Sequence, residues 1–190
     1  MKAIRLVPLF LLSAVVVVYA QQPSDTANRP IRSSLVRTDA EELVLVQEVL
    51  LEAPVARVWA AYTTPEGWTA WASPVAEIDL RAGGTIRTHY DSTATIGDPG
   101  TNILHIINYV PERLLTLQAE LSEGWPEVMK EDAANLMNVI VFESVEDDKT
   151  RILSYGVGYR DSEAYSDLME FFMSANEDLF ETLKTVVEQR

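Results

Sequence analysis

The stretch Asp161–Gln189, DSEAYSDLMEFFMSANEDLFETLKTVVEQ, decides the fold of this chain. Its apolar side chains recur with the helical period of about 3.6 residues and share one broad arc. This arc consists of Tyr165, Leu168, Met169, Phe172, Met173, Ala175, Leu179, Phe180, Leu183, Val186 and Val187. No proline or glycine interrupts the stretch, and Asp161 or Ser162 can cap its start. The pattern predicts one amphipathic helix roughly 42 Å long.

A helix with so wide an apolar arc must pack on an apolar surface of similar length. The preceding chain supplies short strand-like segments: 76–80 and 85–90 alternate between apolar and polar residues, and 42–51 is apolar on both sides and rich in β-favouring residues. These segments lie at 42–51, 76–80, 85–90, 102–109, 114–121, 138–145 and 151–159. Two short helices are expected after the first strand, starting near Pro54 and Thr64, and 123–135 is either a loose helix or an ordered loop. This order predicts an α+β fold with a curved antiparallel sheet of about six to seven strands around the last helix.

Residues 1–20 have the three parts of a secretory signal peptide. Met1–Arg5 is basic, Leu6–Tyr19 is apolar and uncharged, and small residues precede a cleavage site after Ala20. The apolar run is short for a membrane span. We therefore expect a cleaved signal and a secreted or periplasmic protein, with no stable membrane insertion after cleavage. The alternative is a retained N-terminal anchor.

The composition of the chain indicates its domain boundaries and excludes or disfavours several kinds of cross-link and partner. Residues 21–40 are polar, contain Pro23 and Pro30 and lack an apolar period, so we expect a disordered linker before one domain at 41–190. The chain has no cysteine, which excludes disulfides and a lipid-attached cysteine. Its formal net charge of −14 at pH 7 disfavours nucleic acid and anionic membrane surfaces as partners.

Several motifs in the predicted domain resemble the SRPBCC superfamily, which includes START domains and the birch-pollen allergen fold. They are Glu52–Trp59 (EAPVARVW), Thr64–Trp68 (TPEGW) followed by Trp71, and Asp79–Gly84 (DLRAGG). The segment Gly158–Tyr165 is similar to the start of the last helix in one branch, the heat-shock-protein-90 ATPase activator homologues. The resemblance covers nearly the whole domain. Its motifs are structural and carry no chemistry.

This resemblance implies a helix-grip fold, in which an antiparallel sheet wraps around a long C-terminal helix and often leaves an apolar cavity. Members of the superfamily bind lipids, sterols or polyketides, act as co-chaperones, or catalyse cyclisation or hydration. The favoured function is a binding module that holds a small hydrophobic molecule in this cavity. The alternatives are an enzyme of the cyclase or hydratase type and a protein-interaction domain. The predicted export disfavours a co-chaperone role, because the ATPase concerned is cytosolic.

The chain offers little catalytic or metal-binding chemistry. His89 and His105 fall on strands expected to pair, but a metal site would need a further ligand from a carboxylate. No other metal-ligand spacing accompanies the two histidines. The sequence has no cysteine nucleophile, no Gly-Xaa-Ser-Xaa-Gly elbow and no glycine-rich phosphate loop. We therefore assign no catalytic residue, no metal and no cofactor.

The expected ligand site is the cavity between the sheet and the last helix. Small or polar strand residues such as Thr88, Ser154 and Gly156 leave space opposite the apolar arc. The predicted ligand-binding residues are Trp71, Tyr90, Met169, Phe172 and Asn176. Asn176 interrupts the apolar arc, and a buried amide needs a hydrogen-bond partner. That partner is either internal, for example Gln47 or a backbone carbonyl, or a polar group on the ligand.

Overall fold

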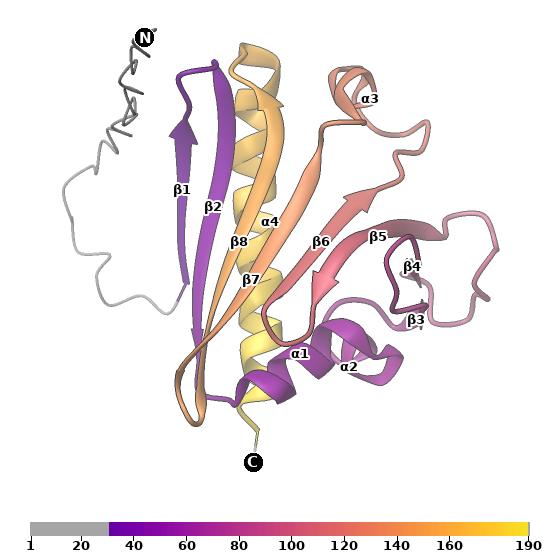
Figure 1. Cartoon of the computed structure of the whole chain (residues 1–190). Helices are drawn as coiled ribbons and strands as arrows, with labels where there is room; N and C mark the ends of the chain where they lie inside the picture. Colours follow the sequence, from indigo (N-terminus) through magenta and orange to yellow (C-terminus); the bar gives the residue numbers. More distant parts are fainter. Residues whose placement is uncertain (1–30, 190) are drawn as a thin grey trace, which may run out of the picture.

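The computed structural model describes residues 31–189 (Figure 1). The strands are β1 (Ile31–Arg37), β2 (Glu42–Leu51), β3 (Val75–Ile78), β4 (Thr85–His89), β5 (Asn102–Val110), β6 (Leu114–Ala119), β7 (Met137–Glu146) and β8 (Lys149–Arg160). The helices are α1 (Val55–Thr63), α2 (Pro65–Thr69), α3 (Glu127–Asp132) and α4 (Glu163–Val187). The predicted signal peptide and residues 21–30 of the predicted linker lie outside the described part of the chain.

The strands form a single antiparallel sheet in the order β1-β2-β8-β7-β6-β5-β4-β3. The chain passes from β2 to β3, at the far edge, through α1 and α2, and α4 then runs along one face of the sheet (Figure 1). This arrangement confirms the predicted α+β helix-grip fold. None of the helices within residues 31–189 is both long enough and apolar enough to cross a membrane.

Strand β1 corrects the sequence prediction in two respects. The disordered linker predicted for 21–40 is wrong over Ile31–Arg37, because this segment pairs with β2 along its whole length. The sheet consequently has eight strands rather than six to seven. Ile31 is its single buried apolar residue, and Leu35 and Val36 are 41% and 42% exposed, so this edge strand lacks the repeated buried positions that would give it a recognisable period. The segment 31–37 is a strand because its backbone pairs with that of β2, an interaction that its side-chain pattern does not reveal.

The buried apolar residues of the described chain fall into two clusters. The larger cluster joins α1 and most strands to the C-terminal half of α4, and it includes Val58, Phe142 and Leu183. The smaller cluster lies towards the start of α4 and includes Tyr165 and Met169. The apolar arc of α4 thus packs on two separate cores, and the space between them is available for a site.

Candidate functional site

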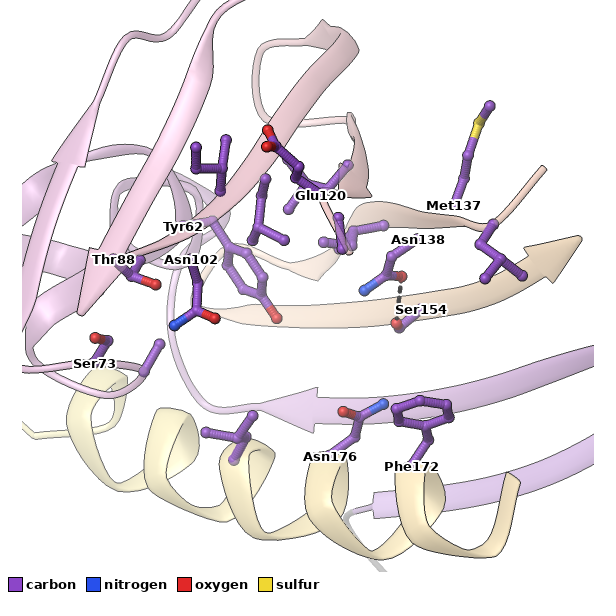
Figure 2. Close-up of a pocket in the computed structure, with 18 of the residues that line it drawn as sticks. Tyr62, Ser73, Thr88, Asn102, Glu120, Met137, Asn138, Ser154, Phe172 and Asn176 are labelled. Carbon is purple, nitrogen blue, oxygen red and sulfur yellow. Dashed lines mark hydrogen bonds between the residues drawn. The ribbon is translucent and has the colours of Figure 1, made fainter. Parts of the chain in front are cut away.

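A cavity of about 350 Å³ lies between the sheet and α4 (Figure 2). Its lining includes members of both core clusters, such as Phe180 from the larger and Met129 from the smaller. Tyr90, Asn102 and Glu120 line it with exposed side chains, so the cavity opens to solvent on this side. Its volume falls within the range of roughly 300–1,000 Å³ that is common for small-molecule sites.

Aromatic rings form two parts of the cavity wall. The first group, from α1, α2 and the turn after α2, consists of Tyr62, Trp68 and Trp71. The ring centroids of this group lie between 4.9 and 6.2 Å apart. The second group consists of Phe172, Trp125 and Tyr159. In this group the Phe172 ring lies 6.3 Å from each of the other two. The two groups offer broad apolar surfaces to a bound molecule.

Tyr62 brings a polar group to the first aromatic group. The residue is only 3% exposed, and Figure 2 shows its hydroxyl pointing into the cavity. Within residues 31–189 this hydroxyl makes no hydrogen bond, and it keeps contact with the cavity space. Burial raises the pKa of Tyr62 above its ordinary value, so the phenol is protonated and neutral at neutral pH. A neutral hydroxyl can both donate and accept a hydrogen bond.

Two amides and two hydroxyls place further polar groups in the wall. Ser154 donates a hydrogen bond of 3.0 Å to Asn138 Oδ1, which leaves the Asn138 Nδ2 protons free of any partner in the described chain (Figure 2). Asn176 Nδ2 donates to Gln47 Oε1 at 2.8 Å, which uses the amide nitrogen and not its oxygen. The buried Thr88 hydroxyl also lines the cavity. Donors and acceptors are therefore available within a mostly apolar space.

The cavity wall carries almost no charge. Glu120 is the single charged residue among the lining residues of the described chain, and no lysine, arginine or histidine joins it there. Its side chain is exposed, and its Oε2 lies 3.2 Å from His105 Nε2 outside the cavity lining. The interior of the site is consequently neutral.

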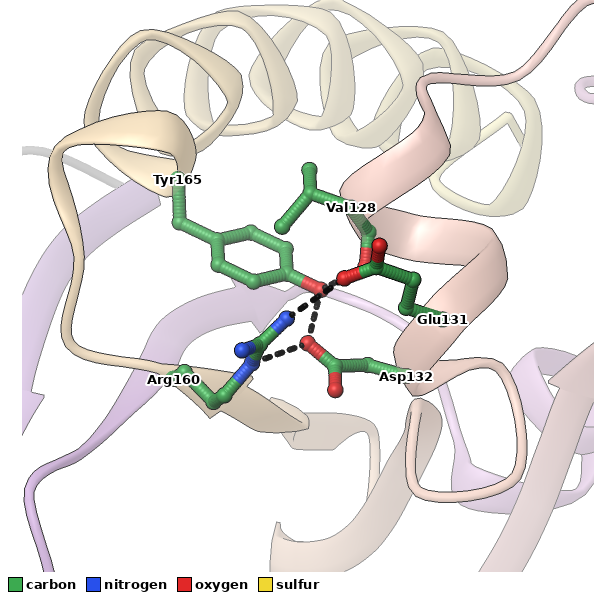
Figure 3. Close-up of polar contacts among 5 residues, drawn as sticks. All are labelled: Val128, Glu131, Asp132, Arg160 and Tyr165. Carbon is green, nitrogen blue, oxygen red and sulfur yellow. Dashed lines mark hydrogen bonds and ion pairs between the residues drawn. The ribbon is translucent and has the colours of Figure 1, made fainter.

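The helix α3 and the segments on either side of it close the cavity near the second aromatic group. Of the two alternatives predicted for 123–135, a loose helix or an ordered loop, the structure has a helix, confined to Glu127–Asp132. Asp132 Oδ2 accepts a hydrogen bond of 2.7 Å from Arg160 Nε and lies 2.8 Å from the Tyr165 hydroxyl (Figure 3). The same hydroxyl lies 3.0 Å from the carbonyl oxygen of Val128. These contacts attach α3 to β8 and to the first turn of α4.

Most of the predicted ligand residues line the cavity. They are Trp71, Tyr90, Phe172 and Asn176. Tyr90 is 70% exposed, which places it at the rim. Met169 is not part of the lining, and its prediction as a cavity residue is wrong: it is fully buried in the smaller cluster with Leu43 and Leu45. Asn176 has the internal partner that one alternative named, Gln47, while its contact with a ligand stays a prediction.

The sequence did not single out Tyr62 or Asn138 as site residues. Tyr62 shares an apolar helix face with Val58, and that pattern indicates a core residue. One feature of the sequence could have indicated a site residue. A tyrosine on a buried helix face usually needs a hydrogen-bond partner for its hydroxyl, and the neighbouring sequence suggests none. Asn138 lies within a strand, and strand periodicity does not reveal which partner its amide will have.

The two histidines lie on paired strands but apart from each other. His105 is opposite Thr85, at the other end of β4 from His89. His89 Nδ1 accepts a hydrogen bond from the Asp91 amide at 3.0 Å, and its Nε2 lies 3.2 Å from the Pro99 carbonyl oxygen. His89 therefore orders the loop between β4 and β5. Within residues 31–189, no group of three or more His, Cys, Asp or Glu side chains is arranged to hold a metal ion.

A long helix held by an antiparallel sheet, with a cavity between them, defines a helix-grip protein. This chain belongs to the family described as Activator of Hsp90 ATPase homolog 1-like protein, whose sequence model matches residues 52–188. The resemblance stated from the motifs is thereby confirmed. Comparison with curated proteins gives no match.

Solved structures share this fold at low sequence identity. The solution structure of the Aha1 dimer from Colwellia psychrerythraea has a TM-score of 0.60 and 16% identity, over 76% of this chain and 96% of that chain. The crystal structure of CalU16 from Micromonospora echinospora also has a TM-score of 0.60, with 20% identity over 85% of this chain and 88% of that chain. At these identities the likeness shows the fold alone.

Proposed function

We propose that this chain is an exported binding module that holds a small hydrophobic or amphipathic molecule between the sheet and α4. The observation that carries the proposal is the cavity of about 350 Å³, with its aromatic walls and its few polar groups. A concave, mostly apolar space with a small number of fixed donors and acceptors is typical of small-molecule sites. Export is supported by the signal-like pattern of residues 1–20.

Filling the cavity from α4 tests this function. Phenylnaphthylamine is an uncharged dye whose emission rises in apolar surroundings, and we expect it to bind the wild-type protein. Leu179 lines the cavity, so Leu179→Trp should occupy part of the space and weaken dye binding about tenfold or more. Fluorescence titration gives both affinities, and thermal unfolding checks that the variant is folded.

Phe171→Trp is the matched control for this experiment. Phe171 lies on the same helix, is 62% exposed and does not line the cavity, so its replacement should leave dye affinity unchanged. Equal dye affinity of the wild-type protein and a folded Leu179→Trp variant would contradict the proposed site. Failure of the wild-type protein to bind the dye would contradict the proposed function itself.

A further inference from the structure

The charge distribution around the cavity restricts what it can hold. A carboxylate or phosphate in the interior would meet no lysine, arginine or histidine from the described lining residues. Burying an unpaired anion costs far more than burying an unpaired neutral polar group. An anionic head left at the rim would instead lie near Glu120, on a chain with a net charge of −14. Both placements are therefore unfavourable for an anion.

A neutral polar group, by contrast, has a prepared partner. Tyr62 is a buried residue whose hydroxyl points into the cavity and has no hydrogen-bond partner within residues 31–189. A ligand that fills this part of the cavity removes water from the hydroxyl, and a hydroxyl then left without a partner is costly, so a ligand that forms this hydrogen bond gains affinity over one that does not. The hydroxyl can donate to a carbonyl or ether oxygen and can accept from an alcohol. The ring beside it belongs to the first aromatic group, which suits the apolar part of the same ligand.

We propose that the cavity selects uncharged ligands that carry a carbonyl or hydroxyl group for Tyr62, and that it rejects anionic lipids such as fatty-acid carboxylates. This selectivity rests on the proposed binding function and specifies its ligand class. It follows from two independent features of the site: the neutral interior with Glu120 at its rim, and the Tyr62 hydroxyl, which points into the cavity and has no hydrogen-bond partner within residues 31–189.

A series with one chain length tests the charge selectivity. Octanol, methyl octanoate and octanoate are titrated separately against the complex of the full chain with phenylnaphthylamine, at neutral pH. The alcohol and the ester should displace the dye, and octanoate should need at least about a tenfold higher concentration. Octanoate that competes as well as its methyl ester overturns the selectivity but leaves the binding function standing. If the dye binds and none of the three displaces it, the selectivity is also overturned.

Tyr62→Phe tests the hydrogen bond separately. It should lower the affinity for methyl octanoate about threefold to tenfold, because the ester carbonyl loses its donor. Its melting temperature should not fall, because no hydrogen bond within the described protein is lost. Tyr155→Phe is the matched control, since it removes a phenol from β8 outside the cavity lining, and its affinity should equal that of the wild type. An unchanged ester affinity in Tyr62→Phe overturns the role of this hydroxyl.

Discussion

Asn176 connects α4 to the sheet through two consecutive side-chain amides. Its Nδ2 donates to Gln47 Oε1, and Gln47 Nε2 donates in turn to Ser33 Oγ at 3.0 Å and to the Met173 carbonyl oxygen at 3.3 Å. Gln47 is 1% exposed, so its polar groups depend on these partners rather than on water. One amide on the helix thus completes the hydrogen bonding of a residue in the middle of β2.

Replacing this amide should destabilise the protein. Asn176→Leu keeps a similar volume but leaves Gln47 Oε1 buried without a donor, so the free energy of unfolding should fall by about 1–3 kcal/mol. Denaturant titration measures the change. Asn108→Leu, at an exposed position on β5, should stay within about 0.5 kcal/mol of the wild type. Undiminished stability of Asn176→Leu would show that the hydrogen bond to Gln47 contributes nothing to the fold.

At the scale of elements, the Asp132 carboxylate contacts both elements to which α3 is attached, β8 and α4. Asp132 is 9% exposed and faces Arg160 and Tyr165. Burial alone would raise the pKa of Asp132, but the hydrogen bonds from Arg160 and Tyr165 outweigh it and lower the pKa below its ordinary value. The folded protein therefore binds this proton less readily than the unfolded chain. The resulting stabilisation is present above the ordinary pKa and is lost as the pH falls through the lower, folded value.

Asp132→Asn should expose this dependence. At neutral pH the variant should unfold with a free energy about 1–3 kcal/mol below that of the wild type. The difference should shrink as the pH falls below about 4, where the unfolded chain begins to bind this proton, and it should be smallest once the pH has passed the lower pKa of the folded carboxyl. Denaturant titrations across the acidic range provide the measurement. Glu131→Gln, which changes the exposed partner of Arg160, should cost at most about 1 kcal/mol. A deficit for Asp132→Asn that is the same at every pH would contradict this account.

At the scale of the whole chain, export is tested by mass. Expression in a host with a secretory pathway should give protein outside the cytoplasm whose intact mass corresponds to a chain that begins at Gln21. Full-length protein recovered from the membrane fraction would identify residues 1–20 as a retained anchor instead.

The sequence predicts the elements of this molecule better than the details of its site. Helix α4 carries a clear apolar period and strand β2 a continuous run of β-favouring apolar residues, so their positions follow from local patterns. The role of Met169 is mispredicted because the arc of α4 is wide enough to face a core cluster as well as the cavity. The direction of the Tyr62 hydroxyl depends on how α1 packs against the sheet, and no local period records that packing.

Three of the chain's four tryptophans, Trp68, Trp71 and Trp125, line the cavity, whereas Trp59 packs against Phe142 outside the lining. The molecule therefore carries natural fluorophores in both aromatic groups of its own wall. A guest that replaces water beside these indoles changes the polarity around them, which alters the wavelength and intensity of their emission. Trp59→Phe would remove the emission of the one tryptophan that does not line the cavity. Empty and occupied molecules can then be told apart by ultraviolet fluorescence, without a dye or label.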